Sequence, residues 1–283
     1  MRAPSSLKND AELLGDIRQA MQALDDAGAV PMFGSLAREG LVRRNIFLGE
    51  LSRVGIKDPE RLAVPSVRND AAFLFTTVGV TSAVAVVAGV ALPGDWGFFV
   101  PYLVGGISLA VLAVGSTAPG LLQVFTDQFS KVFPDYRERI VRHEAAHFLA
   151  GYLLGVPVGG YSLDLGKEHT DFVEAKMAKR IIEGRLSDDE VNLLAVVAMA
   201  GLAAEGVEYD EVIGQTADLQ LLERLMARSE NKMSDQAKMN LTRWAVWSAV
   251  TMLRDNGDAY ERLMAVMRRG GSVRECVAAI EGV

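Results

Sequence analysis

The sequence is poor in the residues that several common classes of protein need. It has one cysteine, Cys276, among 283 residues, so no internal disulfide can form and the fold does not depend on an oxidising compartment. Asp and Glu outnumber Lys and Arg by 36 to 29, and the net charge of −7 argues against a nucleic-acid partner, because phosphate backbones select basic surfaces. The first nine residues lack the apolar stretch of a secretory signal. No G-x-x-x-x-G-K-[S/T] loop occurs, so we expect no ATP binding.

Two long runs without charge set one part of the chain apart. They cover residues 71–94 and 96–126, and each exceeds the ~20 residues that a helix needs to cross a bilayer. Aromatic residues near the turn between them and small residues in the second run are typical of membrane interfaces and of closely packed helices. We therefore predict a transmembrane hairpin over residues 71–126, with spans at about 71–92 and 98–122.

Basic residues beside the predicted spans indicate their orientation. The turn between the spans has no Lys or Arg, whereas the outer ends are flanked by Arg61, Arg68, Lys131, Arg137, Arg139 and Arg142. Positive residues remain on the cytoplasmic side of a membrane or on its organellar equivalent. We therefore expect both termini on the cytoplasmic or stromal side.

The rest of the chain is expected to be mainly helical. Residues 1–70 show helical periodicity without recognisable chemistry, and we interpret them as a helical N-terminal soluble segment. Residues 130–283 contain capping patterns for several helices, the first over about 136–154, and a short strand is expected at 161–165 with a partner at 169–174. The predicted fold class is mainly α: a two-helix hairpin followed by a helical domain with a small β element.

Two of the chain's three histidines lie four residues apart, in the segment His143-Glu144-Ala145-Ala146-His147. On a helix this spacing places both imidazoles on one face, where they can bind one metal ion. Glu144 is then placed to act as general base on a water that zinc makes more acidic. Catalytic zinc takes three protein ligands. A carboxylate is the expected third ligand, but spacing alone does not choose among 36 acidic residues.

Three segments, in this order, resemble the peptidase domain of FtsH-type membrane zinc metalloproteases. The first is the histidine motif at residues 143–147. The second, MAGLAAEG at residues 199–206, resembles the family's AGRAAEE helix, and the third, GQTADL at residues 214–219, resembles its TGAxNDL segment. The resemblance extends from about residue 136 to the end of the chain and implies a zincin-like helical domain that binds Zn²⁺.

The resemblance also assigns residues beyond the histidine motif. It implies that Asp218 is the third zinc ligand. Thr216 is a suitable N-cap that would put Asp218 in a first helical turn, where the helix dipole alone also favours an Asp. Glu205 becomes a candidate to orient a ligand histidine, and an ordinary carboxylate at a helix end is an equally good interpretation of this residue.

The layout departs from FtsH-type proteases in one respect, because those carry an ATPase domain between membrane and peptidase. Here the predicted hairpin ends near residue 126 and the motif helix begins near 136. Together with GDWGFFVPY at residues 94–102, this layout resembles chloroplast and algal FtsH-related proteins that lack the ATPase part. The resemblance implies a thylakoid membrane with the peptidase domain in the stroma. It leaves open a homo-oligomer or an association with ATPase-bearing FtsH-type subunits.

Two functions follow from these observations. The first is a membrane-anchored zinc endopeptidase that hydrolyses membrane or membrane-adjacent proteins, with an extended substrate pairing along the strand at 161–165. The alternative is a catalytically silent pseudoprotease that acts as an assembly or scaffold factor with FtsH-type partners. The missing ATPase favours the alternative, and the intact Glu144 disfavours it. An intramembrane zinc protease is disfavoured because the motif helix carries too many charges to lie in lipid.

Overall fold

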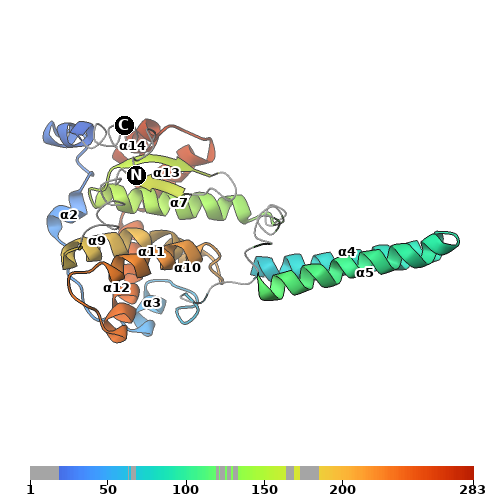
Figure 1. Cartoon of the computed structure of the whole chain (residues 1–283). Helices are drawn as coiled ribbons and strands as arrows, with labels where there is room; N and C mark the ends of the chain where they lie inside the picture. The colour runs from blue at the N-terminus through green and yellow to red at the C-terminus, as the bar shows by residue number, and fades with distance from the viewer. Residues whose placement is uncertain are drawn as a thin grey trace, which may run out of the picture. The chain divides into compact units, whose positions relative to one another are not determined.

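The computed structural model is mainly helical, as the sequence predicts (Figure 1). It describes residues 19–62, 64, 68–118, 121, 125, 129, 133–163, 169–172 and 185–283. The chain forms two compact units: one holds residues 66–137, and the other joins residues up to 65 with residues 138–283.

The first unit contains two long helices that lie side by side, α4 (Arg68–Ala91) and α5 (Asp95–Thr117) (Figure 1). The first turn of α5 requires glycine at Gly97, because a Cβ there would lie 2.6 Å from the carbonyl oxygen of Leu92. Farther along the pair, the Ser108 hydroxyl donates a hydrogen bond to Thr81 Oγ1 at 2.6 Å. The predicted second span extended to 122. The structure ends α5 at 117, and most of residues 119–126 lie outside the described part of the chain.

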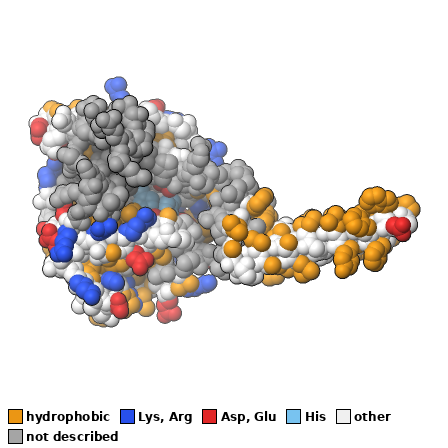
Figure 2. Space-filling model, in the orientation of Figure 1, with side chains coloured by type: hydrophobic (Ala, Val, Ile, Leu, Met, Phe, Trp, Pro, Cys, Tyr) orange, Lys and Arg blue, Asp and Glu red, His pale blue; other side chains and the backbone are white. Residues whose placement is uncertain are grey.

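By length and composition, three helical stretches in the described residues could cross a membrane: 71–91, 95–117 and 188–208. The first two have apolar side chains directed outward, and Figure 2 shows these side chains along the pair. The third differs, because 83 % of its most apolar window is buried inside the second unit. Packing in the protein core therefore accounts for the apolarity of residues 188–208.

The second unit is built around helix α7 (Tyr136–Leu153), which is buried along most of its length. An antiparallel pair of strands, β1 (Val158–Ser162) and β2 (His169–Phe172), lies along one side of α7 (Figure 1). The predicted strand at 161–165 thus begins three residues earlier in the structure, and residues 164–165 lie outside the described residues. On the other side of α7 are α9 (Asp188–Ala198) and α10 (Ala200–Glu208). These two helices follow one another directly and meet at Met199.

Four further helices complete this unit. The described C-terminal half continues through α11 (Gln215–Ala227), α12 (Asp235–Asp255), α13 (Gly257–Arg268) and α14 (Val273–Glu281). Of these, α11 and α12 pack against α9 and α10, and α14 packs against α13 and β1. Because α11 packs against α9 and α10, its first turn comes close to the buried face of α7.

The N-terminal segment packs into the same unit as the C-terminal helices. Residues 19–26 are helical, and two short helices follow, α2 (Ser35–Glu39) and α3 (Leu48–Arg53). The core receives the buried side chains of Val30, Phe33, Ile46, Leu51, Ile56 and Leu62. Hydrogen bonds add to this packing: Trp244 Nε1 donates to the Val42 carbonyl at 3.2 Å, and the Met32 amide donates to Glu281 at 3.1 Å.

Candidate metal centre

Helix α7 carries the histidine motif on a face that is closed to solvent. His143 and His147 are one turn apart, and their side chains converge as the spacing of four residues requires. Both histidines and Glu144 are at most 8 % exposed. At its N-terminal end α7 is joined to α13 through Glu138, which accepts hydrogen bonds from Arg268 at 2.9 and 2.5 Å. The burial of the two histidines and Glu144 places the motif in the interior of the unit.

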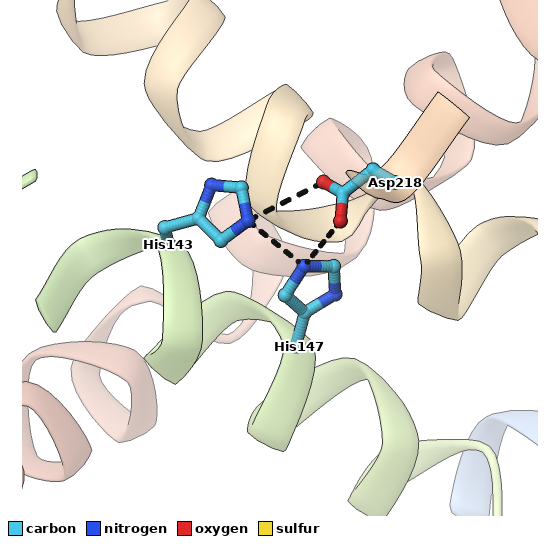
Figure 3. A group of neighbouring side chains, drawn as sticks. All are labelled: His143, His147 and Asp218. Atoms are coloured by element: carbon cyan, nitrogen blue, oxygen red, sulfur yellow. Dashed lines mark hydrogen bonds and ion pairs between the residues drawn. The ribbon is translucent and has the colours of Figure 1, made fainter. Parts of the chain in front are cut away.

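Helix α11 supplies a carboxylate to the same place. Asp218 lies in the first turn of α11, with Oδ1 3.2 Å from His147 Nε2 and Oδ2 3.3 Å from His143 Nε2 (Figure 3). The two Nε2 atoms are 3.1 Å apart. The helix begins at Gln215 with Gly214 as its N-cap, so the expectation of Thr216 at that position is wrong, although the predicted place of Asp218 in the first turn is correct. The structure thus brings together the three predicted ligands.

Hydrogen bonds on the outer ring nitrogens determine which nitrogen of each histidine is protonated. His143 Nδ1 lies 2.8 Å from Glu205 Oε1, and His147 Nδ1 lies 2.8 Å from the main-chain oxygen of Val197. An ionised carboxylate and a carbonyl can only accept hydrogen bonds, so both Nδ1 atoms carry the proton. In the neutral imidazoles the Nε2 lone pairs are therefore directed at each other and at Asp218.

When both imidazoles are neutral, the cluster holds acceptor atoms without a donor, and it could hold a metal ion. Asp218 Oδ2 is buried and has no hydrogen-bond partner in the described structure. Ligands that bind one metal ion at ~2.1 Å, at angles between octahedral and tetrahedral, lie about 3.0–3.4 Å apart. The separations of 3.1 to 3.3 Å fall in that interval. The residues present therefore fit a cation by donor chemistry, spacing and burial.

The charges at the site favour a positive ion or proton there. Burial alone would lower the pKa of His143, yet the Asp218 carboxylate and then Glu205 raise this pKa well above its ordinary value. Burial also opposes the charge on His147, and Asp218 again raises the pKa. Burial would raise the pKa of Asp218, but the two histidines lower it. Without a metal, protons on the imidazoles compensate the carboxylate, and a metal must displace them.

Glu205 is held as an ionised carboxylate on α10, at 2 % exposure. It accepts hydrogen bonds from the amides of Ile213 at 3.1 Å and Gly214 at 3.2 Å, and its Oε2 is 3.4 Å from Arg139 Nη1. Burial would raise the pKa of Glu205, and the contact with His143 lowers it, helped by the Ile213 amide and Arg139. The structure therefore places Glu205 where the orienting role was predicted.

Arg139 and Thr170 belong to the site and were missed by the sequence reasoning. Arg139 precedes His143 by one turn of α7, so the helical periodicity itself could have identified it. Its guanidinium packs over the Tyr209 ring at 3.6 Å. Thr170 on β2 donates to Glu144 Oε2 at 2.8 Å, and no local pattern signals this contact.

Two glycines allow the close approach of the ligand helices. A Cβ at Gly201 would lie 2.5 Å from His143 Cδ2 and Cε1, and one at Gly214 would lie 2.8 Å from both Glu205 Oε1 and His143 Cε1. Residues of all three segments singled out in the sequence therefore meet at one site. Comparisons of this chain with protein-family models, with curated proteins and with solved structures found no match.

Proposed function

We propose that this chain is a membrane-anchored zinc endopeptidase of the FtsH type that has no ATPase of its own. The observation that carries the proposal is the buried convergence of His143, His147 and Asp218, with Glu144 next to the first ligand. Two neutral imidazoles and one carboxylate leave a coordination position for water or substrate, which is the arrangement of catalytic rather than structural zinc sites.

Each side chain then has a role in peptide hydrolysis. His143, His147 and Asp218 would hold the ion, and Glu205 would keep His143 oriented through the 2.8 Å contact at Nδ1. Bound zinc lowers the pKa of water and polarises the substrate carbonyl as a Lewis acid. Glu144 would take one proton from water while the water oxygen attacks the carbonyl carbon. It would return that proton to the amide nitrogen as the C–N bond breaks. The products are a carboxylic acid and an amine.

Strand β1 is the proposed contact for an extended substrate. It pairs with β2 through one edge, and in the described residues no strand pairs with its other edge. An unpaired edge can receive a peptide by main-chain hydrogen bonds. This mode selects extended chains rather than folded domains. The substrates are therefore unfolded segments of membrane or membrane-adjacent proteins, or chains delivered by an ATPase-bearing partner.

The test uses the full-length protein purified in detergent, with zinc content measured by mass spectrometry and cleavage measured on unfolded casein. Glu144→Gln should retain zinc and lose activity by about 10²–10⁴-fold, because it removes the general base. Glu208→Gln is the matched control, since Glu208 is on the surface of the same unit and should leave both quantities unchanged.

Three results would contradict the proposal. One is equal casein cleavage by the wild type and Glu144→Gln. Another is the absence of metal, and a third is iron in place of zinc, since two histidines and one carboxylate also suit Fe(II). Rescue of a loss-of-function strain by Glu144→Gln would instead favour an assembly or scaffold role.

The membrane part of the proposal assigns α4 and α5 as two spans. Their lengths of 24 and 23 residues match a bilayer core, and their outward-facing side chains are apolar. We propose that both termini lie on the cytoplasmic or stromal side, which the charge pattern supports, and that the membrane is the thylakoid, which the resemblance supports.

A labelling experiment tests this topology. In a Cys276→Ser background, a cysteine at Asp95 should react with a membrane-impermeant maleimide only from the lumenal or extracellular side. A cysteine at Glu230, in the second unit, should react only from the other side. Labelling of both positions from one side would exclude two spans.

A further inference from the structure

A single side chain connects the β-strands to the motif helix at its proposed base. Thr170 stands opposite Tyr161 in the antiparallel pair, and its hydroxyl lies 2.8 Å from Glu144 Oε2 and 3.2 Å from the Glu144 main-chain oxygen. A hydroxyl has one proton to donate, and an ionised carboxylate is the stronger acceptor. The hydrogen bond to Oε2 is therefore the principal one.

This contact matters because the Glu144 carboxylate is buried. Glu144 is 5 % exposed, and a buried carboxylate is costly unless hydrogen bonds satisfy it. Within the part of the chain that the structure describes, Thr170 is the one donor to this carboxylate. The position of the carboxylate thus depends on a residue of β2, an element that is separate from the helix that carries Glu144.

We infer that Thr170 is a positioning residue for the general base. Its hydroxyl holds Oε2 of Glu144, so that Oε1 is the oxygen that exchanges a proton with water and with the leaving nitrogen. This inference rests on the proposed peptidase function. Because the hydrogen bonds of the Thr170 hydroxyl in the described structure go to Glu144 and not to a proposed metal ligand, its loss should alter the chemical step without altering metal binding.

The inference also connects substrate contact with catalysis. Thr170 pairs with Tyr161 of β1, the strand that is the proposed substrate contact. A peptide that extends the sheet through β1 would thereby fix β2 and the hydroxyl that holds Glu144. Positioning errors of about 1 Å at a catalytic group reduce rates by about 100-fold. A shift of that size in the Glu144 carboxylate after loss of this hydrogen bond would therefore lower the rate measurably.

The experiment compares Thr170→Val, Thr170→Ser and Thr242→Val in the full-length, zinc-loaded protein. Thr170→Val keeps the shape of the side chain and removes the hydroxyl. It should lower kcat on casein by about 10–100-fold, leave KM within about twofold and retain one zinc per chain. Thr170→Ser should restore most of kcat. Thr242→Val is the matched control, because that hydroxyl bonds the Lys238 carbonyl within α12 and should not affect kcat.

A readout independent of activity tests the same hydrogen bond. In metal-free protein, unfolding is followed by the fluorescence of tryptophan, which includes the buried Trp244. Thr170→Val should lower the unfolding midpoint in the wild-type background and change it much less in a Glu144→Ala background. Equal shifts in the two backgrounds would show that the hydroxyl and the carboxylate do not interact.

The outcomes separate this inference from the proposed function. If the wild type cleaves casein, Glu144→Gln does not, and Thr170→Val matches the wild type, then the inference is wrong and the function stands. The inference is also wrong if Thr170→Ser is as impaired as Thr170→Val, or if Thr170→Val loses zinc. If the wild type is no more active than Glu144→Gln, both the function and the inference are wrong.

Discussion

Replacing Glu205 by Gln removes one charge from a carboxylate that accepts hydrogen bonds at both oxygens. Oε1 faces His143 Nδ1 and the Gly214 amide, and Oε2 faces the Ile213 amide and Arg139. All four partners are donors. A glutamine offers one acceptor oxygen and one NH₂ group. Whichever way the amide is turned, its NH₂ group must face one of the two pairs of donors. The substitution therefore disturbs the site in both orientations of the new amide.

The magnitude follows from the role of this contact in metal binding. Loss of a partner that orients a ligand histidine typically weakens metal affinity by 10–100-fold, which is about 1.4–2.7 kcal/mol. Glu205 is almost fully buried, and its replacement by Gln also removes the negative charge that faces the buried Arg139 guanidinium. We therefore expect a value in the upper part of that range, near 100-fold.

The assay is competition for zinc against a chromophoric chelator at pH 7.5, with the full-length protein in detergent. The control is Glu208→Gln, on the same helix, whose carboxylate lies half-exposed at 3.6 Å from Arg142. It should change zinc affinity by less than about twofold. Wild-type affinity in Glu205→Gln, or an equal loss in the control, would refute the argument that Glu205 orients His143.

Four further predictions concern the metal site and the helix pair. Gly201→Ala should abolish zinc binding, because the new Cβ would lie 2.5 Å from ring atoms of His143. In the same chelator competition, zinc affinity should fall as the pH drops below the raised pKa of His143, because protons on the histidines, which Asp218 stabilises, compete with the ion. The metal-free protein should lose stability as the pH rises from about 6.5 through that raised pKa. His143 binds its proton more tightly in the folded state than in the unfolded state, so it stabilises the fold only while it is protonated. Ser108→Ala should weaken the pairing of α4 and α5 by about 0.6 kcal/mol through loss of the hydrogen bond to Thr81.

The two substitutions have matched control variants, and the pH dependence of stability has a contrary result. Gly257→Ala adds a methyl group in open space at the start of α13, so it should leave zinc affinity unchanged, and equal losses in the two variants would contradict the steric argument. For the pH dependence, chelator-treated protein is unfolded by denaturant between pH 5 and 9, and stability that rises with pH would contradict the sign. For Ser108→Ala, the control is Ser116→Ala, whose hydroxyl bonds a carbonyl of its own helix, and the measurement is reversible unfolding in bicelles.

Much of the secondary structure could be predicted from the sequence because its causes are local. A helix repeats every 3.6 residues, so two histidines four residues apart share a face wherever the helix lies. The helix at 136–154, predicted from a local capping pattern, agrees with α7 at 136–153. The two uncharged runs likewise predict apolar helices of membrane length, since composition and length are properties of the segment alone.

The third ligand shows where local reasoning ends. Residue spacing left 36 acidic side chains to choose from, and only the resemblance singled out Asp218. In the structure this residue reaches the histidines because α11 packs against α9 and α10, which lie beside α7. Such a contact between distant segments has no signature in the spacing of either segment.

The environment of the site was decided by tertiary structure alone. The partner of His147 is the main-chain carbonyl of Val197, and any residue could supply that oxygen. Thr170 reaches Glu144 from a strand, and residues 30–62 join the core formed by the C-terminal helices. The sequence by itself determined that two histidines share one face of a helix and can bind one metal ion. Packing decided which of them are buried together, because burial and hydrogen bonding depend on elements that are far apart along the chain.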